Sequence, residues 1–187
     1  VMGTAHLLDA TRQLQRPPAV IVVTSDKCYE NRETTHPYTE SDHLGGHDPY
    51  SSSKACAEIV AASWQCSFPD SAHIATARAG NVIGGGDWAS DRLMPDLVRA
   101  FQAGDEVRIR SPEALRPWQH VLDPLHGYLL LAQSAAAGKG LGAWNFGPDE
   151  YEAWSVARLV GAAASKWGDD ARWCLDARPQ PHEARLL

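Results

Sequence analysis

Tyr50 and Lys54 lie four positions apart in the segment Tyr50-Ser51-Ser52-Ser53-Lys54. On a helix, residues i and i+4 share one face, so the lysine ammonium can approach the tyrosine phenol. A phenol with an ordinary pKa of about 10 is a poor base at neutral pH, but a neighbouring cation favours the phenolate. The spacing therefore indicates a tyrosine that can take a proton from an alcohol. Coincidence produces the same short pattern in unrelated sequences.

Ser25, Asp26 and Lys27 offer a hydroxyl, an acid and a possible base in three consecutive residues. They follow the run Ala19–Val23, which is apolar at every position and typical of a strand buried on both faces. Ligands of open α/β sheets bind at the carboxyl ends of the strands. Successive strand residues face opposite ways, so these three converge only where the strand has already turned. A plain strand-to-loop transition with solvated charges explains the residues equally well.

The elements that must position these residues alternate between strand and helix. We expect helices over residues 3–14, 50–64, 94–102, 124–137 and 155–166, with strands over residues 19–23, 73–79, 107–109, 119–122 and 144–146. Gly104 is expected to close the third helix, and Ser155 to cap the last one. This alternation predicts an α/β fold with a mostly parallel, doubly wound sheet covered on both faces.

The composition is that of a soluble globular chain. Its 187 residues suit one domain, and 44% apolar and 21% charged residues are near the globular average. The net charge of −6 gives no reason to expect nucleic acid, and no apolar run approaches the roughly 18 residues that span a membrane. We expect a cytoplasmic protein with no membrane partner. Its four cysteines are scattered, which predicts free thiols.

Two further patterns are weaker. His36, His43 and His47 follow no common ligand spacing, so a solvated loop is favoured over a metal site and no metal is expected. The run Gly84-Gly85-Gly86 opens no obvious helix and is better read as a tight turn than as a phosphate-binding loop. No G-x-G-x-x-G motif occurs in the chain.

Several ordered motifs resemble those of the extended short-chain dehydrogenases/reductases that act on nucleotide sugars. The motifs are Thr24-Ser25-Asp26-Lys27, Tyr50-x-x-x-Lys54, Arg78-Ala79-Gly80-Asn81-Val82 and Arg116-Pro117-Trp118-Gln119-His120-Val121. The opening Val1-Met2-Gly3-Thr4 is similar to the helix before that family's catalytic strand. Within the family, residues 25–31 and 84–89 look most like the subgroup that dehydrates CDP-glucose. The resemblance implies a Rossmann-like sheet and NAD as cofactor.

The resemblance also implies roles for the first two motifs. Tyr50 and Lys54 would contact NAD, and Tyr50 would take the O4 proton while Ser25 hydrogen-bonds O4. Water loss across C5 and C6 would use Asp26 as the acid and Lys27 as the C5 base, giving CDP-4-keto-6-deoxyglucose. Glutamate stands in place of Lys27 in the dTDP-glucose subgroup, and a lysine must be neutral to act as a base.

Substrate-binding roles come from the same resemblance. Asn81 would contact the sugar nucleotide, and Arg116 would grip its diphosphate through a planar guanidinium. A surface ion pair is the alternative for Arg116. Arg92 is a weaker candidate for the diphosphate or the base, and His182 begins a late substrate-side motif. Arg78 is expected to be structural.

Residues 1–90 are expected to form the later portion of an NAD-binding Rossmann domain. Residues 91–187 would form mainly a small nucleotide-sugar-binding part, interleaved with late Rossmann elements. The missing glycine-rich loop is interpreted as truncation at the amino terminus, so the 187 residues alone are expected to be inactive. A homodimer is expected through the helix of Tyr50 and Lys54, by way of exposed alanine-rich positions. A 4-epimerase and a non-catalytic Rossmann-like binding module remain the alternatives.

Overall fold

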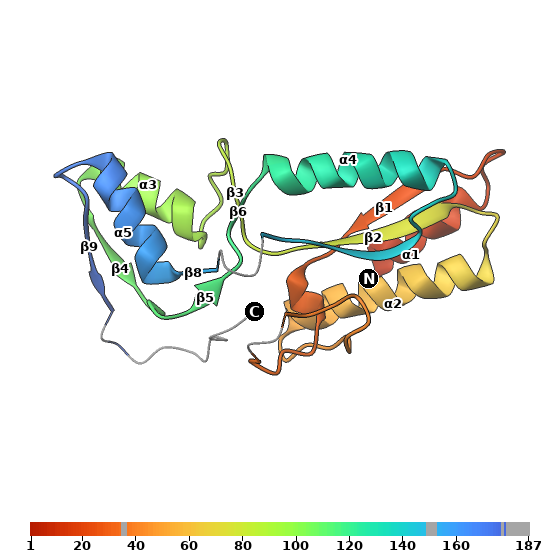
Figure 1. Ribbon diagram of the computed structural model, residues 1–187, viewed down its shortest axis with the longest axis horizontal. Coiled ribbons are helices and arrows are strands. Elements are labelled where there is room, and N and C mark those ends of the chain that lie inside the picture. Colours follow the sequence, from red (N-terminus) through yellow and green to blue (C-terminus); the bar gives the residue numbers. More distant parts are fainter. Residues whose placement is uncertain (35–36, 149–152, 177, 179–187) are drawn as a thin grey trace.

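The computed structural model describes residues 1–34, 37–148, 153–176 and 178, arranged as a larger and a smaller α/β unit (Figure 1). The larger unit is built on the strands β1 (Ala19–Val23), β2 (His73–Ala79) and β7 (Gly142–Phe146). Their order is β1-β2-β7, and both pairings are parallel. All carboxyl ends of these strands therefore meet at one edge of the sheet, where the predicted catalytic residues follow β1.

Helices cover both faces of this sheet, as the alternating pattern predicted. On one face, α1 (Met2–Thr11) and α2 (Pro49–Ser67) pack through Leu8 and Ala61 against Ile74 of β2. On the other, α4 (Leu122–Ala136) packs through Leu131 against Ala75 and Ala77 (Figure 1). Adjacent residues of β2 serve opposite faces because side chains alternate along a strand. The doubly wound α/β class is confirmed.

The smaller unit consists of α3 (Leu93–Ala103), β4 (Glu106–Ile109), α5 (Val156–Trp167) and β9 (Arg172–Leu175). Strands β4 and β9 are parallel, and a separate core forms around Leu97, Phe101, Ile109 and Val160. Two expected helix signals are confirmed here. Gly104 ends α3 with a left-handed φ of 72°, and the Ser155 hydroxyl caps α5 by accepting from the backbone N–H of Arg158.

Short strands join the two units, and the sequence indicated only one of them, within the strand expected over residues 119–122. The strand β3 (Val82–Ile83) runs parallel to β6 (Gln119–His120), and β5 (Leu115–Arg116) runs antiparallel to β8 (Trp154–Ser155). Figure 1 shows β3 and β6 between the larger and the smaller unit. The other two-residue strands have no periodicity to read, so only tertiary pairing reveals them.

Two expectations about burial need correction. Ala55, Ala57 and Ala61 of α2 are buried rather than exposed, because they are small enough for the helix to lie close against the structure beneath it. Strand β1 is only partly buried, and Val23 is 49% exposed. Among the described residues, β1 has a partner strand on one side only.

All four cysteines are free thiols, as expected. Cys28 is fully buried, and burial raises the pKa of its thiol to about 12. Over the part of the chain that the structure describes, no helix is both long enough and apolar enough to cross a membrane.

Two helical glycines give a matched test of this packing. A Cβ added at Gly127 of α4 would overlap the Phe146 ring, whereas one added at Gly161 of α5 would meet no atom. We expect Gly161→Ala to raise the free energy of unfolding by about 0.5–1 kcal/mol, and Gly127→Ala to lower it by about 1–3 kcal/mol. Urea unfolding followed by circular dichroism measures both, and a stabilised Gly127→Ala variant would contradict the packing of α4 on β7.

Candidate active site

The chain turns directly after β1, which brings neighbouring side chains together. Ser25 caps the short 3₁₀ helix η1 (Asp26–Cys28), its Oγ accepting from the Lys27 N–H at 3.2 Å. The same hydroxyl donates to Asp26 Oδ1 at 2.9 Å. Ser25 is buried and Lys27 is exposed. The segment is thus an ordered turn at the carboxyl edge of the sheet and not a run of solvated charges.

Asp26 lies in an environment that favours its protonated form. Its Oδ2 is buried and has no hydrogen-bond partner among the described residues. Burial raises the pKa of this carboxyl, although the Ser25 hydroxyl, the Lys27 N–H and the charges of Lys27 and Arg116 act in the opposite direction. A carboxyl with a raised pKa holds its proton to higher pH than an exposed one and can donate that proton to a leaving group.

Gly80 brings three of the sequence motifs to one point. A Cβ atom at this position would lie 2.7 Å from Pro117 Cγ and 2.9 Å from Asp26 Oδ2. Only a residue without a side chain allows the end of β2 to approach both. Sequence reasoning placed Gly80 inside a motif without giving it this role, because close approach cannot be read from a single glycine.

Tyr50 and Lys54 share one face at the start of α2, as their spacing predicted. The Lys54 Nζ lies 5.7 Å from the centroid of the Tyr50 ring, and the tyrosine is 48% exposed. Asp48 caps the helix by accepting from the backbone N–H groups of Tyr50 and Ser51, at 2.9 and 3.0 Å. Hydrogen bonds from Ser51 are the main reason that the pKa of Asp48 is lowered.

Helix α2 packs on the turn that carries the acidic residue. Ala55, which follows Lys54, forms a buried cluster with Cys28 and Tyr29 at the end of η1. A small residue here lets the helix approach closely. The packing brings the Tyr50–Lys54 end of α2 to the same edge of the sheet as Asp26.

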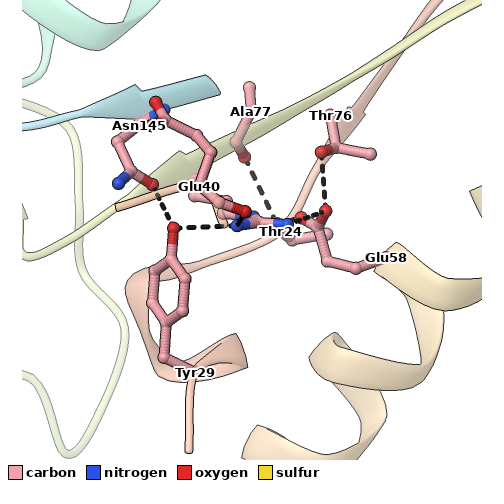
Figure 2. A network of polar contacts seen from close by, with 8 residues as sticks. Thr24, Tyr29, Glu40, Glu58, Thr76, Ala77 and Asn145 are labelled. Atoms are coloured by element: carbon pink, nitrogen blue, oxygen red, sulfur yellow. Dashed lines mark hydrogen bonds and ion pairs between the residues drawn. The ribbon is translucent and has the colours of Figure 1, made fainter. Parts of the chain in front are cut away.

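A buried polar network lies beneath this edge (Figure 2). Arg78 Nη2 donates to Glu58 Oε2 at 2.8 Å, and the side chains are only 4% and 3% exposed. Thr24 and Thr76 donate to the same carboxylate. Arg78 is therefore structural, as expected. Sequence reasoning missed Glu58, although its position one turn after Lys54 was a usable signal.

The expected substrate-binding residues lie in different surroundings. Asn81 follows β2, and its carbonyl accepts from the Gln119 N–H at 3.0 Å. Arg116 is 5% exposed, which does not fit a surface ion pair, and its Nη1 donates to the Leu115 carbonyl at 2.7 Å. Arg92 is exposed at the start of α3 in the smaller unit. His182 lies outside the described residues.

No group of three or more His, Cys, Asp or Glu side chains capable of holding a metal ion occurs among the residues that the structure describes. His36 lies outside that part of the chain. The chemistry available at the sheet edge is instead that of a phenol beside an ammonium and a buried carboxyl beside a second lysine.

Ligands of open α/β sheets bind at the carboxyl ends of the strands, which is where these groups lie. Residues 1–147 match the family described as NAD dependent epimerase/dehydratase, and the chain belongs to this family. It is 49% identical over 196 residues to the CDP-glucose 4,6-dehydratase of Salmonella typhimurium. That alignment covers 100% of this chain and 55% of the relative, so the chain spans about half of that relative's length.

Solved structures have the same fold. The dTDP-glucose 4,6-dehydratase of Bacillus anthracis, in complex with NAD, superposes with a TM-score of 0.83 at 22% identity, over 100% of this chain and 57% of that one. The UDP-glucuronic acid 4-epimerase of Bacillus cereus has a TM-score of 0.85 at 17% identity, over 100% and 56% of the two chains. Because dehydratases and epimerases fit equally well, the fold does not distinguish these two activities.

The opposite pKa shifts of Asp26 and Asp48 predict opposite dependences of stability on pH. The folded-state pKa of Asp26 is raised, so ionisation of Asp26 destabilises the fold as pH rises above the ordinary aspartate pKa of about 3.9. That of Asp48 is lowered, so its contribution to stability is lost as pH falls toward and below the ordinary value. We expect Asp26→Asn to stabilise at pH 7 and to match the unsubstituted protein near pH 3.5. Asp48→Asn should lose stability at pH 7 and approach the unsubstituted protein at low pH.

Urea unfolding of both variants at several pH values measures this difference. Asparagine retains the shape of each side chain and the capping ability of Asp48, so the comparison isolates the charge. An Asp26→Asn variant less stable than the unsubstituted protein at pH 7 would show that the ionised carboxylate is the favoured form.

Proposed function

We propose that this chain is part of an NAD-dependent CDP-glucose 4,6-dehydratase. The observation that carries the proposal is the placement of a buried, protonatable carboxyl, Asp26, at the sheet edge that also holds Tyr50 and Lys54. An oxidation at C4 needs the tyrosine and lysine, and loss of water needs the additional acid. The 49% identity to a CDP-glucose 4,6-dehydratase supports the same substrate.

Tyr50 and Lys54 fit a role beside the nicotinamide ribose of NAD. Tyr50 is half-exposed at the carboxyl edge, and the ammonium of Lys54 lies over its ring. Bound NAD+ would supply a two-electron acceptor for C4 and return the same electrons to C6. The chain has no G-x-G-x-x-G motif, so these residues would hold only the nicotinamide end of the cofactor.

Oxidation at C4 uses the first pair of residues. Tyr50 takes the O4 proton as the C4–H bond breaks, and Lys54 favours the phenolate form that accepts it. Ser25, whose hydroxyl is held in the turn after β1, hydrogen-bonds O4. The product is a C4 ketone, which makes the neighbouring C5 proton acidic.

Water loss uses the second pair. Lys27 removes the C5 proton, the C5=C6 double bond forms, and the C6–O bond breaks. Asp26 donates its proton to the departing hydroxyl, which leaves as water. The double bond then receives the returned electrons with hydrogen at C6 and a proton at C5, giving CDP-4-keto-6-deoxyglucose. The raised pKa of Asp26 favours the protonated form that this role needs, whereas Lys27 must be neutral when it acts.

The remaining assignments belong to the same proposal. Residues 1–90 carry the later part of the NAD-binding domain, and residues 91–187 carry mainly the nucleotide-sugar part. Asn81 contacts the sugar nucleotide and Arg116 its diphosphate, with Arg92 and His182 as further substrate contacts. Arg116 is already close enough to Asp26 to influence its charge.

We also propose that the protein is a cytoplasmic homodimer formed through α2. The outward positions of this helix support association, because Ile59 is 56% exposed and its neighbours Cys56, Ala62 and Cys66 are small and exposed. Small side chains around one larger apolar residue allow two helices to pack closely.

The substrate is tested with the protein encoded by the complete reading frame that contains this chain. We expect incubation with NAD+ and CDP-glucose in deuterated water to yield CDP-4-keto-6-deoxyglucose with deuterium at C5, identified by NMR. The dTDP, UDP and GDP sugars serve as controls. The same product from another nucleotide would overturn the CDP assignment, an epimerised sugar would indicate a 4-epimerase, and no reaction would favour a binding module.

Single substitutions separate the two halves of the reaction. Tyr50→Phe should lower turnover by about 10²–10⁴-fold, as expected when a positioned acid–base group is removed. Asp26→Asn should still oxidise C4 but accumulate reduced cofactor, because the C6 hydroxyl no longer receives a proton. Absorbance at the wavelength of the reduced nicotinamide follows both. Equal loss of C4 oxidation in Asp26→Asn would contradict its role as the acid for water loss.

A further inference from the structure

We infer that the buried Glu58–Arg78 pair positions the turn of Asp26 and Lys27 relative to the helix of Tyr50 and Lys54. The inference rests on the proposed function and adds two positioning residues to it. Glu58 lies on α2, four residues after Lys54 and eight after Tyr50. Spacings of four place these residues along one side of the helix. Along this side, the residues run from the half-exposed Tyr50 to the buried Glu58.

The Glu58 carboxylate holds the amino-terminal end of the catalytic turn. It accepts a hydrogen bond from the hydroxyl of Thr24, the residue directly before Ser25. The Thr24 backbone N–H also donates to the Ala77 carbonyl of β2 at 2.9 Å. Thr24 is thus fixed to the strand and to the helix at once (Figure 2).

Arg78 holds the carboxyl-terminal end of the same turn. Its Nη1 donates to the hydroxyl of Tyr29 at 2.8 Å, and its guanidinium carbon lies 4.9 Å from the centroid of the Tyr29 ring. Tyr29 follows η1 immediately, and its hydroxyl donates in turn to Asn145 Oδ1 of β7 at 2.7 Å. Figure 2 shows Tyr29 reaching up to Asn145 from the end of the turn.

One ion pair therefore fixes both flanks of the segment that carries Ser25, Asp26 and Lys27. Glu58, the acidic member of the pair, lies on the same helix as Tyr50 and Lys54. A small displacement between these two groups would separate the residues for C4 oxidation from those for water loss. Misplacement by about 1 Å can cost roughly a hundredfold in rate. Neither Glu58 nor Arg78 needs to touch the substrate for this effect.

A double substitution separates positioning from mere stability. Replacing a buried ion pair with apolar residues of similar volume is often neutral or stabilising, so Glu58→Met with Arg78→Met should fold. It removes the hydrogen bond of Thr24 to Glu58 and that of Arg78 to Tyr29, and leaves the packing of Tyr29 on Ala55 in place. In the full-length enzyme we expect water loss, which needs both Asp26 and Lys27 of the turn, to slow by roughly a hundredfold. C4 oxidation should slow less, because Tyr50 and Lys54 stay in place and only the Ser25 hydrogen bond to O4 is weakened. Reduced cofactor should then accumulate in a single turnover.

Hydrogen–deuterium exchange of the same full-length variants, measured without substrate, shows whether the hydrogen bonds of Glu58 and Arg78 hold the turn in place. Amides of residues 24–29 should exchange faster in the double variant, with Glu58→Gln intermediate because it retains one acceptor oxygen. Leu97→Ala, in the separate core of the smaller unit, is the matched control: it should lower stability without changing exchange at residues 24–29 or the ratio of the two rates.

The outcomes are distinct. Unchanged exchange at residues 24–29, or an unchanged ratio of water loss to C4 oxidation, would overturn the positioning role. If the unsubstituted enzyme does not dehydrate CDP-glucose, the proposed function fails, and the exchange experiment still decides whether Glu58 and Arg78 hold the turn.

Discussion

The buried ion pair between Glu58 and Arg78 is the constraint on which the larger unit depends. Removing two charges from water costs several kcal/mol for each ion, so further hydrogen bonds to both groups are needed to offset that cost. Thr24 and Thr76 donate to the carboxylate, and Arg78 Nη1 donates to Tyr29 and to the Glu40 carbonyl. The buried Arg78 Nε has no hydrogen-bond partner among the described residues. Losing one partner would cost about 3–5 kcal/mol. Helix α2, strands β1 and β2, and the turn after β1 are therefore held in a single arrangement.

Above this pair, the site contains one exposed and one enclosed side chain. Tyr50 is half-exposed, whereas Asp26 is enclosed and burial raises the pKa of its carboxyl. Enclosure depends on the close approach of Gly80 and Pro117. The positive charge of Arg116 acts against this rise in the pKa of Asp26. The same sheet edge therefore holds an exposed phenol and an enclosed carboxyl, whose surroundings favour different protonation states.

The sequence was sufficient to predict the larger elements and most residues with chemical groups. A continuous apolar run located β1, the alternation of strands with helices located β2, and helical spacing placed Tyr50 beside Lys54. It was insufficient for β5 and β8, which are too short to show a period, and for Glu58, whose role depends on partners 18 to 34 residues away. The burial of Ala55, Ala57 and Ala61 was also missed, because small residues suit both a buried contact and an exposed helix face.

The order of the strands in space has a consequence for synthesis of the chain. Glu58 meets Thr24 and Thr76 across separations of 34 and 18 residues, whereas Tyr29 meets Asn145 across 116 residues. Long-range pairings of this kind form late, because closing a large loop costs entropy before any contact offsets it. On a ribosome, the turn after β1 can bind its helix early, but it gains its last hydrogen bond only after the smaller unit's first helix and strand have emerged. Until Asn145 has emerged, the Tyr29 hydroxyl can form hydrogen bonds only with Arg78 or with water.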